Sequence, residues 1–315
     1  MTQMRKGYLA ALIAVLIWSG FIIVSRMGGV SGLSAYDVMA IRYFTCASVL
    51  LPIWGFKYRF NMFKARFIVV SLIGGLAYAL CTFRGFQLSS ASHASLLLPG
   101  LIPLFIIVLS AVINREAQTK LKWLGIGAIT LGVAALFSQQ LSVVQGVSEG
   151  DLWFVAGSFC WALFSILIKR WGITPWQATV SLAVITCTLY LPVYVLWLPK
   201  TLSNALWSDI FLQVFYQGFL ATIIQMIFYV KAVQYIGPSS MGAMMAIVPV
   251  LSGVSAILIF DEPATPTLLI SLTLVSLGAW IAHSAVFQDS QRVQQRLDIS
   301  KLPTIPPKKL KARTV

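Results

Sequence analysis

Charged residues are scarce in this chain. Only 10% of its 315 residues are Asp, Glu, Lys or Arg, whereas 58% are hydrophobic. A soluble domain carries roughly a quarter of its residues as charged side chains. The composition therefore excludes an ordinary soluble protein and indicates an all-α integral membrane protein.

Patterns that support enzyme chemistry are also missing. The sequence has no HExxH pair, no phosphate-binding loop and no paired carboxylates within its apolar runs. The four cysteines lie inside apolar runs without paired spacing, which predicts neither a disulfide framework nor a zinc site. We therefore expect no enzyme, no cofactor and no metal site. A channel would need a filter-like loop or a ring of charges, and neither is evident.

The net charge of +14 is spread over short segments and the C-terminal tail. These basic residues form no patch with stacking aromatic side chains, which argues against nucleic acid as a partner. Anionic lipid headgroups are the partner that such segments favour. We therefore expect the lipid bilayer, together with a small-molecule substrate, as the main partners.

Ten apolar runs follow one another along the chain, with only short connections between them. A helix of about 20 apolar residues is long enough to cross a bilayer. The expected spans cover residues 7–26, 37–56, 67–86, 93–113, 121–138, 150–169, 176–198, 210–230, 240–260 and 267–286.

Lys and Arg alternate strongly between the two sides that these spans define. The side that includes the N-terminus and the basic tail holds most of them, whereas the other side holds only Arg26, Arg84 and Lys200. Because cytoplasmic connections carry the excess of basic residues, both termini are predicted to be cytoplasmic. The expected location is the cell membrane, which is the inner membrane in a Gram-negative cell.

The chain repeats itself internally. Pro103, Glu116 and Gly132 recur 146 residues later, and Trp18 recurs in the second half; the matching residues are Pro249, Glu262, Gly278 and Trp161. Each unit has five spans, and an odd number places the second unit in the membrane upside down. The sequence predicts ten transmembrane helices as two inverted five-helix repeats, residues 1–140 and 146–287, followed by a tail of residues 288–315.

Several short motifs occur in the same order as in a known family. The sequence resembles the drug/metabolite transporter superfamily, in particular its ten-helix members with two EamA-type repeats. The matching pieces are Trp18-Ser19-Gly20, Arg42-Tyr43-Phe44, Phe86–Ser92, Trp123-Leu124-Gly125, Tyr235–Ser239 and the repeated Pro, Glu and Gly positions. The basic residue that usually follows the family's Glu is replaced by Ala117 and Pro263. The resemblance spans about residues 7 to 286 and implies a permease with a central cavity.

The expected function is a secondary transporter that moves a small organic metabolite across the cytoplasmic membrane by alternating access. The resemblance implies export of an amino acid or a derivative. A multidrug efflux carrier and a non-transporting membrane scaffold remain alternatives.

Arg42 is the most informative charge, because it lies inside the second span, where an unpaired charge is costly. It either contacts a substrate carboxylate or phosphate, forms a gating ion pair, pairs with Asp37, or snorkels to the surface.

Other polar and aromatic residues are candidates for a cavity wall. Trp18 and Trp161 occupy equivalent mid-span positions, and Tyr78, Gln225 and Tyr229 lie at or near the middle of the third and eighth spans. Packing between the repeats explains the tryptophans equally well.

His93 lies near the outer end of the fourth span, where an imidazole either relays protons or is simply hydrogen-bonded. Pro99, Pro103 and Pro249 are expected to kink their helices or act as hinges. Small residues in the fifth and tenth spans, including Ala128, Gly132 and Gly278, favour close helix packing and leave a homodimer open.

Overall fold

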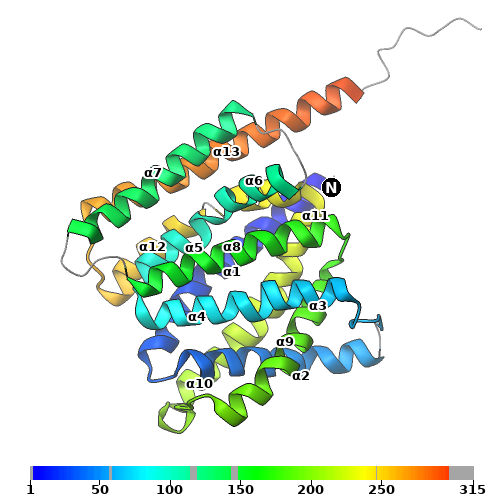
Figure 1. The fold of residues 1–315 in the computed structure, drawn as a ribbon, viewed down its shortest axis with the longest axis vertical. Helices are drawn as coiled ribbons and strands as arrows, with labels where there is room; N and C mark the ends of the chain where they lie inside the picture. Colours follow the sequence, from blue (N-terminus) through cyan, green and yellow to red (C-terminus); the bar gives the residue numbers. More distant parts are fainter. Residues whose placement is uncertain (1–2, 57–58, 114–118, 143–147, 246, 298–315) are drawn as a thin grey trace, which may run out of the picture.

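The fold is a bundle of long helices (Figure 1). A computed structural model describes residues 3–56, 59–113, 119–142, 148–245 and 247–297. Eight helical stretches are long and apolar enough to cross a membrane, and two shorter apolar helices complete the ten expected spans. The prediction of an all-helical membrane protein with ten spans is confirmed.

The first five spans use seven α-helices and one π-helical segment. In chain order these are α1 (Gln3–Val30), α2 (Ala35–Phe56), α3 (Ala65–Ser71), η1 (Leu72–Ala77), α4 (Tyr78–Leu88), α5 (Ala91–Gly100), α6 (Ile102–Ile113) and α7 (Lys120–Ser142). The third span is the continuous stretch α3–η1–α4, and the fourth is α5 followed by α6. Glu116 lies outside the described residues.

The second five spans follow the same plan. They are built from α8 (Glu149–Arg170), α9 (Pro175–Trp197), η2 (Leu202–Asn204), α10 (Trp207–Gln213), η3 (Val214–Ile224), α11 (Gln225–Met244), α12 (Ile247–Phe260) and α13 (Pro266–Leu297). Helix α13 extends into the segment that the sequence predicted as a tail beginning at residue 288. Residues 298–315 lie outside the described part of the chain.

The first connection of each repeat has the same design. Gly32 and Gly172 both have positive φ, 86° and 57°, a conformation that glycine adopts without steric cost. Ser34 and Thr174 then cap α2 and α9, each exchanging hydrogen bonds with the residue three positions on, Asp37 or Gln177. The duplication therefore extends to individual turns.

The two repeats run in opposite directions. At one end of the bundle, Arg26 at the end of α1 donates to the carbonyl oxygens of Phe86 and Ser89, over 3.1 and 3.2 Å. At the other end, Lys169 at the end of α8 donates to the carbonyl oxygen of Gln234 over 2.7 Å. Equivalent basic residues thus cap the carbonyl ends of equivalent spans at opposite ends of the molecule.

π-Helical segments occupy corresponding places in the two repeats. Residues 72–77 form one in the third span, and residues 214–224 form one in the eighth. Tyr78 is the first residue after the first segment, and Gln225 is the first after the second. Such segments often lie at functional sites because they redirect side chains and loosen the helical hydrogen-bond ladder.

The fourth and ninth spans are both interrupted. The fourth breaks at Leu101 between α5 and α6. The ninth starts after the kink at Gly237, where φ is 84° and ψ is 160°, and it breaks between the end of α11 at Met244 and the start of α12 at Ile247. Pro103 and Pro249 each lie beside a glycine of the other interrupted span: a Cβ on Gly242 would lie 3.5 Å from the Cα of Pro103. A Cβ on Gly100 would lie 3.9 Å from Cγ of Pro249.

Spans of one repeat pack against spans of the other throughout the bundle. The main pairs are α1 with α11, α2 with α9, α4 with α8, α5 with α12 and α7 with α13. In the last pair the two backbones come close together, since a Cβ on Gly125 would lie 2.5 Å from the carbonyl oxygen of Gly278. The small residues predicted to allow close packing do so within the chain.

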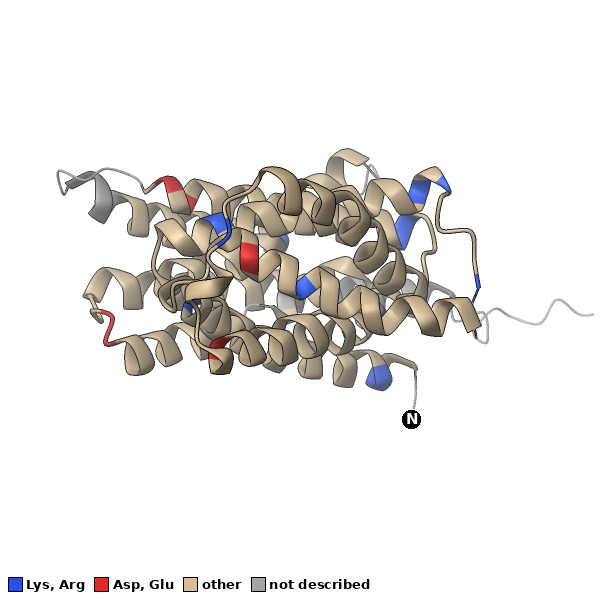
Figure 2. Ribbon diagram, turned by 90° about the horizontal axis from the view of Figure 1, so that it is seen from below, with Lys and Arg blue, Asp and Glu red and all other residues tan. Residues whose placement is uncertain are grey.

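The two ends of the bundle differ in charge (Figure 2). Lys and Arg gather mainly at the end where α1 begins, which we call the basic end. Most of the Asp and Glu residues that Figure 2 colours lie toward the opposite end, which we call the acidic end. Asp37 and Asp151 lie in the first turns of α2 and α8, and Glu262 lies in the connection before α13.

Candidate functional site

Four aromatic side chains meet between the repeats, and we call them, with Phe164, the aromatic cluster. The ring of Trp161 lies 5.1 Å from that of Trp18, 4.6 Å from that of Tyr78 and 5.1 Å from that of Tyr229, measured between centroids. All four side chains are at most 3% exposed. They come from α1, α4, α8 and α11, so the first and third spans of both repeats contribute. These predicted cavity residues therefore lie together rather than facing lipid.

Two buried polar atoms in and beside the aromatic cluster make no hydrogen bond of standard geometry. Tyr229 Oη lies 2.6 Å from Ser165 Oγ and shares a hydrogen bond with it. By contrast, Trp161 Nε1 and the Nε2 of Gln225, which lies one turn before Tyr229 on α11, are buried without such a bond to the described residues. Buried polar groups are nearly always paired in native proteins, so these two atoms require an explanation.

Arg42 is buried a short distance away, in α2. Its guanidinium Nη1 donates to Oε1 of Gln217 over 3.2 Å, and Gln217 Nε2 donates to Ser25 Oγ over 2.8 Å. The guanidinium carbon also lies 5.2 Å from the ring centroid of Phe21 and 5.8 Å from that of Phe83. We call these five residues the Arg42 site. With 3% of its surface exposed, Arg42 does not snorkel to the bundle surface.

Asp37 is not the partner of Arg42. Its carboxylate accepts hydrogen bonds from Ser34, Thr201 and Tyr194, with the Tyr194 hydroxyl 2.5 Å away. This arrangement ties the start of α2 to α9 and to the segment after α9. Of the two structural alternatives left open by the sequence, snorkelling and pairing with Asp37, the structure has neither.

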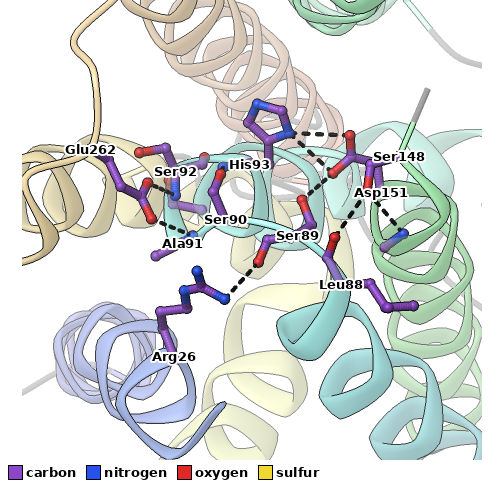
Figure 3. Close-up of polar contacts among 12 residues, drawn as sticks. Arg26, Leu88, Ser89, Ser90, Ala91, Ser92, His93, Ser148, Asp151 and Glu262 are labelled. Atoms are coloured by element: carbon purple, nitrogen blue, oxygen red, sulfur yellow. Dashed lines mark hydrogen bonds and ion pairs between the residues drawn. The ribbon is translucent and has the colours of Figure 1, made fainter. Parts of the chain in front are cut away.

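A second polar group closes the acidic end, and we call it the corner network (Figure 3). Asp151 is fully buried at the start of α8 and accepts a 2.6 Å hydrogen bond from Ser89 Oγ. Nδ1 of His93 lies 3.1 Å from both carboxylate oxygens of Asp151. Arg26 binds the carbonyl of Ser89 on the other side. His93 therefore belongs to this network, whereas the aromatic cluster is formed by other residues.

Glu262 completes the corner network from the connection before α13. Its two carboxylate oxygens accept hydrogen bonds from the backbone N–H groups of Ala91 and Ser92, over 2.9 and 2.8 Å. A carboxylate there satisfies free amides at the start of α5 and complements the helix dipole. The repeated Glu of the second hairpin thus caps the fourth span.

Sequence reasoning missed several residues that the structure places in these sites. Gln217, Ser25 and Phe21 surround Arg42, and Asp151 pairs with His93. The available signal for Gln217 was its amide in the otherwise apolar run of the eighth span. Asp151 was visible as an acidic residue near a span end, but its partner is 58 residues away.

Inverted repeats with interrupted spans and a buried aromatic and polar site between them are typical of membrane transporters. The EamA-like transporter family matches residues 5–138 and again residues 148–283. The chain belongs to this family, whose members are transporters and not enzymes.

The chain is also similar to a known transporter and to a solved structure. The chain is 26% identical, over 261 residues, to "Uncharacterized transporter YyaM" of Bacillus subtilis (strain 168), covering 78% of this chain and 84% of that protein. The fold is similar to a solved structure described only as "Crystal structure of protein", with a TM-score of 0.64 and 19% identity. That similarity covers 93% of this chain and 99% of the other, and it shows the fold alone.

Proposed function

We propose that this EamA-family transporter is a secondary carrier that moves a small organic metabolite, such as an amino acid or a derivative, across the cytoplasmic membrane. The observation that carries the proposal is the aromatic cluster. Two equivalent tryptophans meet between the repeats, and Trp161 Nε1 and Gln225 Nε2 make no hydrogen bond of standard geometry to the described residues. A solute bound there supplies such bonds and contacts both halves at once.

Transport in this proposal proceeds by alternating access, with one repeat rocking against the other around the aromatic cluster. The interrupted fourth and ninth spans supply hinges, since Pro99 and Pro103 flank one break and Pro249 follows the other. The π-helical segments beside Tyr78 and Gln225 support the same idea. Helices with weakened backbone ladders bend at lower energetic cost than regular ones.

We also propose how the chain is divided and how it lies in the membrane. Residues 1–140 and 146–287 form the two repeats, and residues 288–315 form a basic cytoplasmic tail. The basic end faces the cytoplasm, with both termini there, because cytoplasmic segments carry the excess of Lys and Arg. A homodimer would use the outward faces of α7 and α13, since Gly125 and Gly278 already contact each other within the chain.

Proteoliposomes that contain the purified protein test the function. Uptake and efflux of labelled amino acids, other small metabolites and cationic drugs are measured with and without a pH gradient. Saturable flux of a metabolite supports the proposal, whereas flux of the drugs alone assigns the protein to multidrug efflux. No flux across the panel would contradict transport and favour a membrane scaffold.

The same assay tests proton coupling at the corner network. Flux that responds to the gradient and loses that response in His93→Gln assigns coupling to the His93–Asp151 pair. Flux that is indifferent to the gradient makes the protein a facilitator or an exchanger.

A further inference from the structure

Arg42 is a buried cation without a counter-charge. Among the described residues, no acidic side chain lies within 4 Å of its guanidinium nitrogens, and its one hydrogen bond is to the neutral amide of Gln217. Its Nε is buried and finds no partner in the same part of the chain. An arginine has five N–H donors in a planar fork, so most of the binding capacity of this side chain is unused.

The two acidic side chains that are buried in the described part of the chain are bound by other residues. Asp37, five positions before Arg42, is held by Thr201 and Tyr194, and Asp151 is held by Ser89 and His93. The ring faces of Phe21, Tyr43 and Phe83 stabilise the guanidinium partly through cation–π attraction. Such contacts offset only part of the cost of burying a charge in a membrane-spanning bundle.

The Arg42 site and the aromatic cluster are built on neighbouring positions of the same helices. Phe21 and Trp18 lie one turn apart on α1, and Phe83 and Tyr78 lie on α4. Gln217 belongs to the π-helical segment of the eighth span, which ends directly before Gln225. A single small molecule can therefore engage both groups, with its charged end and its apolar body on different residues.

We propose that Arg42, assisted by Gln217, is the anion subsite of the transport site, and that the substrate is an organic anion. Its acid group, a carboxylate or a phosphate, takes the unused guanidinium donors. Its apolar or aromatic body packs on Trp18, Trp161 and Tyr78. This inference rests on the proposed transport function and adds the charge and shape of the solute. It also argues against cationic drugs, which Arg42 would repel.

The competing account is that Arg42 is only a structural tie between α2 and the eighth span. The two accounts differ in ligand selectivity. An anion subsite makes binding depend on the charge of the solute, whereas a structural tie leaves selectivity unchanged when the fold survives.

The experiment measures binding to the full-length protein in nanodiscs from the rise in its thermal unfolding temperature with ligand concentration. The probes are phenylacetate, phenyl phosphate and the neutral phenylacetamide, all at one ionic strength. We expect either anion to bind at least about tenfold more tightly than the amide. A ratio of that order corresponds to the free energy of a hydrogen bond to a charged group. Preference between the two anions identifies the acid group. Equal binding of all three probes to the wild-type protein, or no binding of either anion, would by itself overturn the inference.

Variants then assign the selectivity to one residue. Arg42→Gln is expected to abolish the preference for anions, and Arg42→Lys to retain part of it, since an ammonium keeps the charge but lacks the planar fork. Arg66→Gln is the matched control, because Arg66 also lies over a ring, that of Phe67, but at the start of α3. Anion preference that survives in a folded Arg42→Gln protein contradicts the inference. The flux assay separates the anion subsite from the transport function. Flux of neutral solutes only would refute the anion subsite but would still support transport.

Discussion

Trp18 and Trp161 occupy the same position in two inverted repeats, and their rings lie against each other with centroids 5.1 Å apart. Helices α1 and α8 run in opposite directions, so the two side chains meet where the halves of the bundle meet. A contact of this kind changes whenever one repeat moves against the other. In the mechanism that we propose, this pair contacts the solute from both sides and rearranges as the solute passes.

The first prediction concerns these two tryptophans. Trp18→Phe and Trp161→Phe keep aromatic bulk but remove the indole N–H and part of the ring, so we expect flux in proteoliposomes to fall several-fold with little loss of thermal stability. Trp197→Phe is the control, because that residue is 73% exposed at the end of α9. Equal flux in all three variants would contradict a transport role for the aromatic cluster.

The basic caps of the two repeats provide a second prediction. Arg26→Gln removes two charge-assisted hydrogen bonds to carbonyls at the end of α4 and should destabilise the protein by about 1 kcal/mol, a value reduced for its partial exposure. Lys169→Gln removes one bond from an exposed side chain and should have a smaller effect. Thermal unfolding in micelles compares them. A larger loss for Lys169→Gln would show that the corner network does not depend on Arg26.

Glu262 gives a third prediction. Glu262→Gln weakens the cap of α5 and should cost about 1 kcal/mol, because the charge that complements two free amides is lost. The specific readout is hydrogen exchange, in which the amides of Ala91 and Ser92 should lose protection. Glu149→Gln serves as the comparison, since Glu149 bonds to the side chain of Trp153 instead. Unchanged exchange at Ala91 and Ser92 would rule out this capping role.

The packing of α7 against α13 gives a fourth prediction. A side chain at Gly125 would collide with the backbone of Gly278, so Gly125→Val should destabilise the protein by about 1 to 3 kcal/mol through overpacking. Gly127 lies two residues along the same helix and has no atom within 4 Å of an added Cβ. Gly127→Val should therefore be much milder. Similar losses of stability in both variants would mean that helix propensity, and not the close contact, dominates.

The fold was largely predictable because membrane spans and repeats leave strong signals. Apolar runs of sufficient length define the ten spans, and the recurrence of Trp18 as Trp161 defines the duplication. The turn at Gly237-Pro238 separates the eighth span from the ninth, and it lies between the predicted spans 210–230 and 240–260. The π-helical segments left no sequence signal, because their hydrogen-bond pattern is set by tertiary packing.

The sites were predictable only in part, for a physical reason. The position of Arg42 in the second span left both burial and snorkelling open, and its partner Gln217 lies 175 residues away in the other repeat. Asp37 seemed the nearer partner in sequence, yet it caps its own helix and binds Thr201. Pairing between distant polar residues depends on how the repeats dock, which composition and periodicity do not encode.

The central claim is that the aromatic cluster is a site that opens alternately to the two ends of the bundle. The direct measurement is labelling of Gln225→Cys, in a protein whose four native cysteines are replaced, by a membrane-impermeant maleimide applied to either side of sealed vesicles. Gln225 is 2% exposed, so a static structure protects it from both sides. Our account predicts labelling from each side in turn, slowed by a transported solute. Labelling from one side only, or from neither, would contradict it.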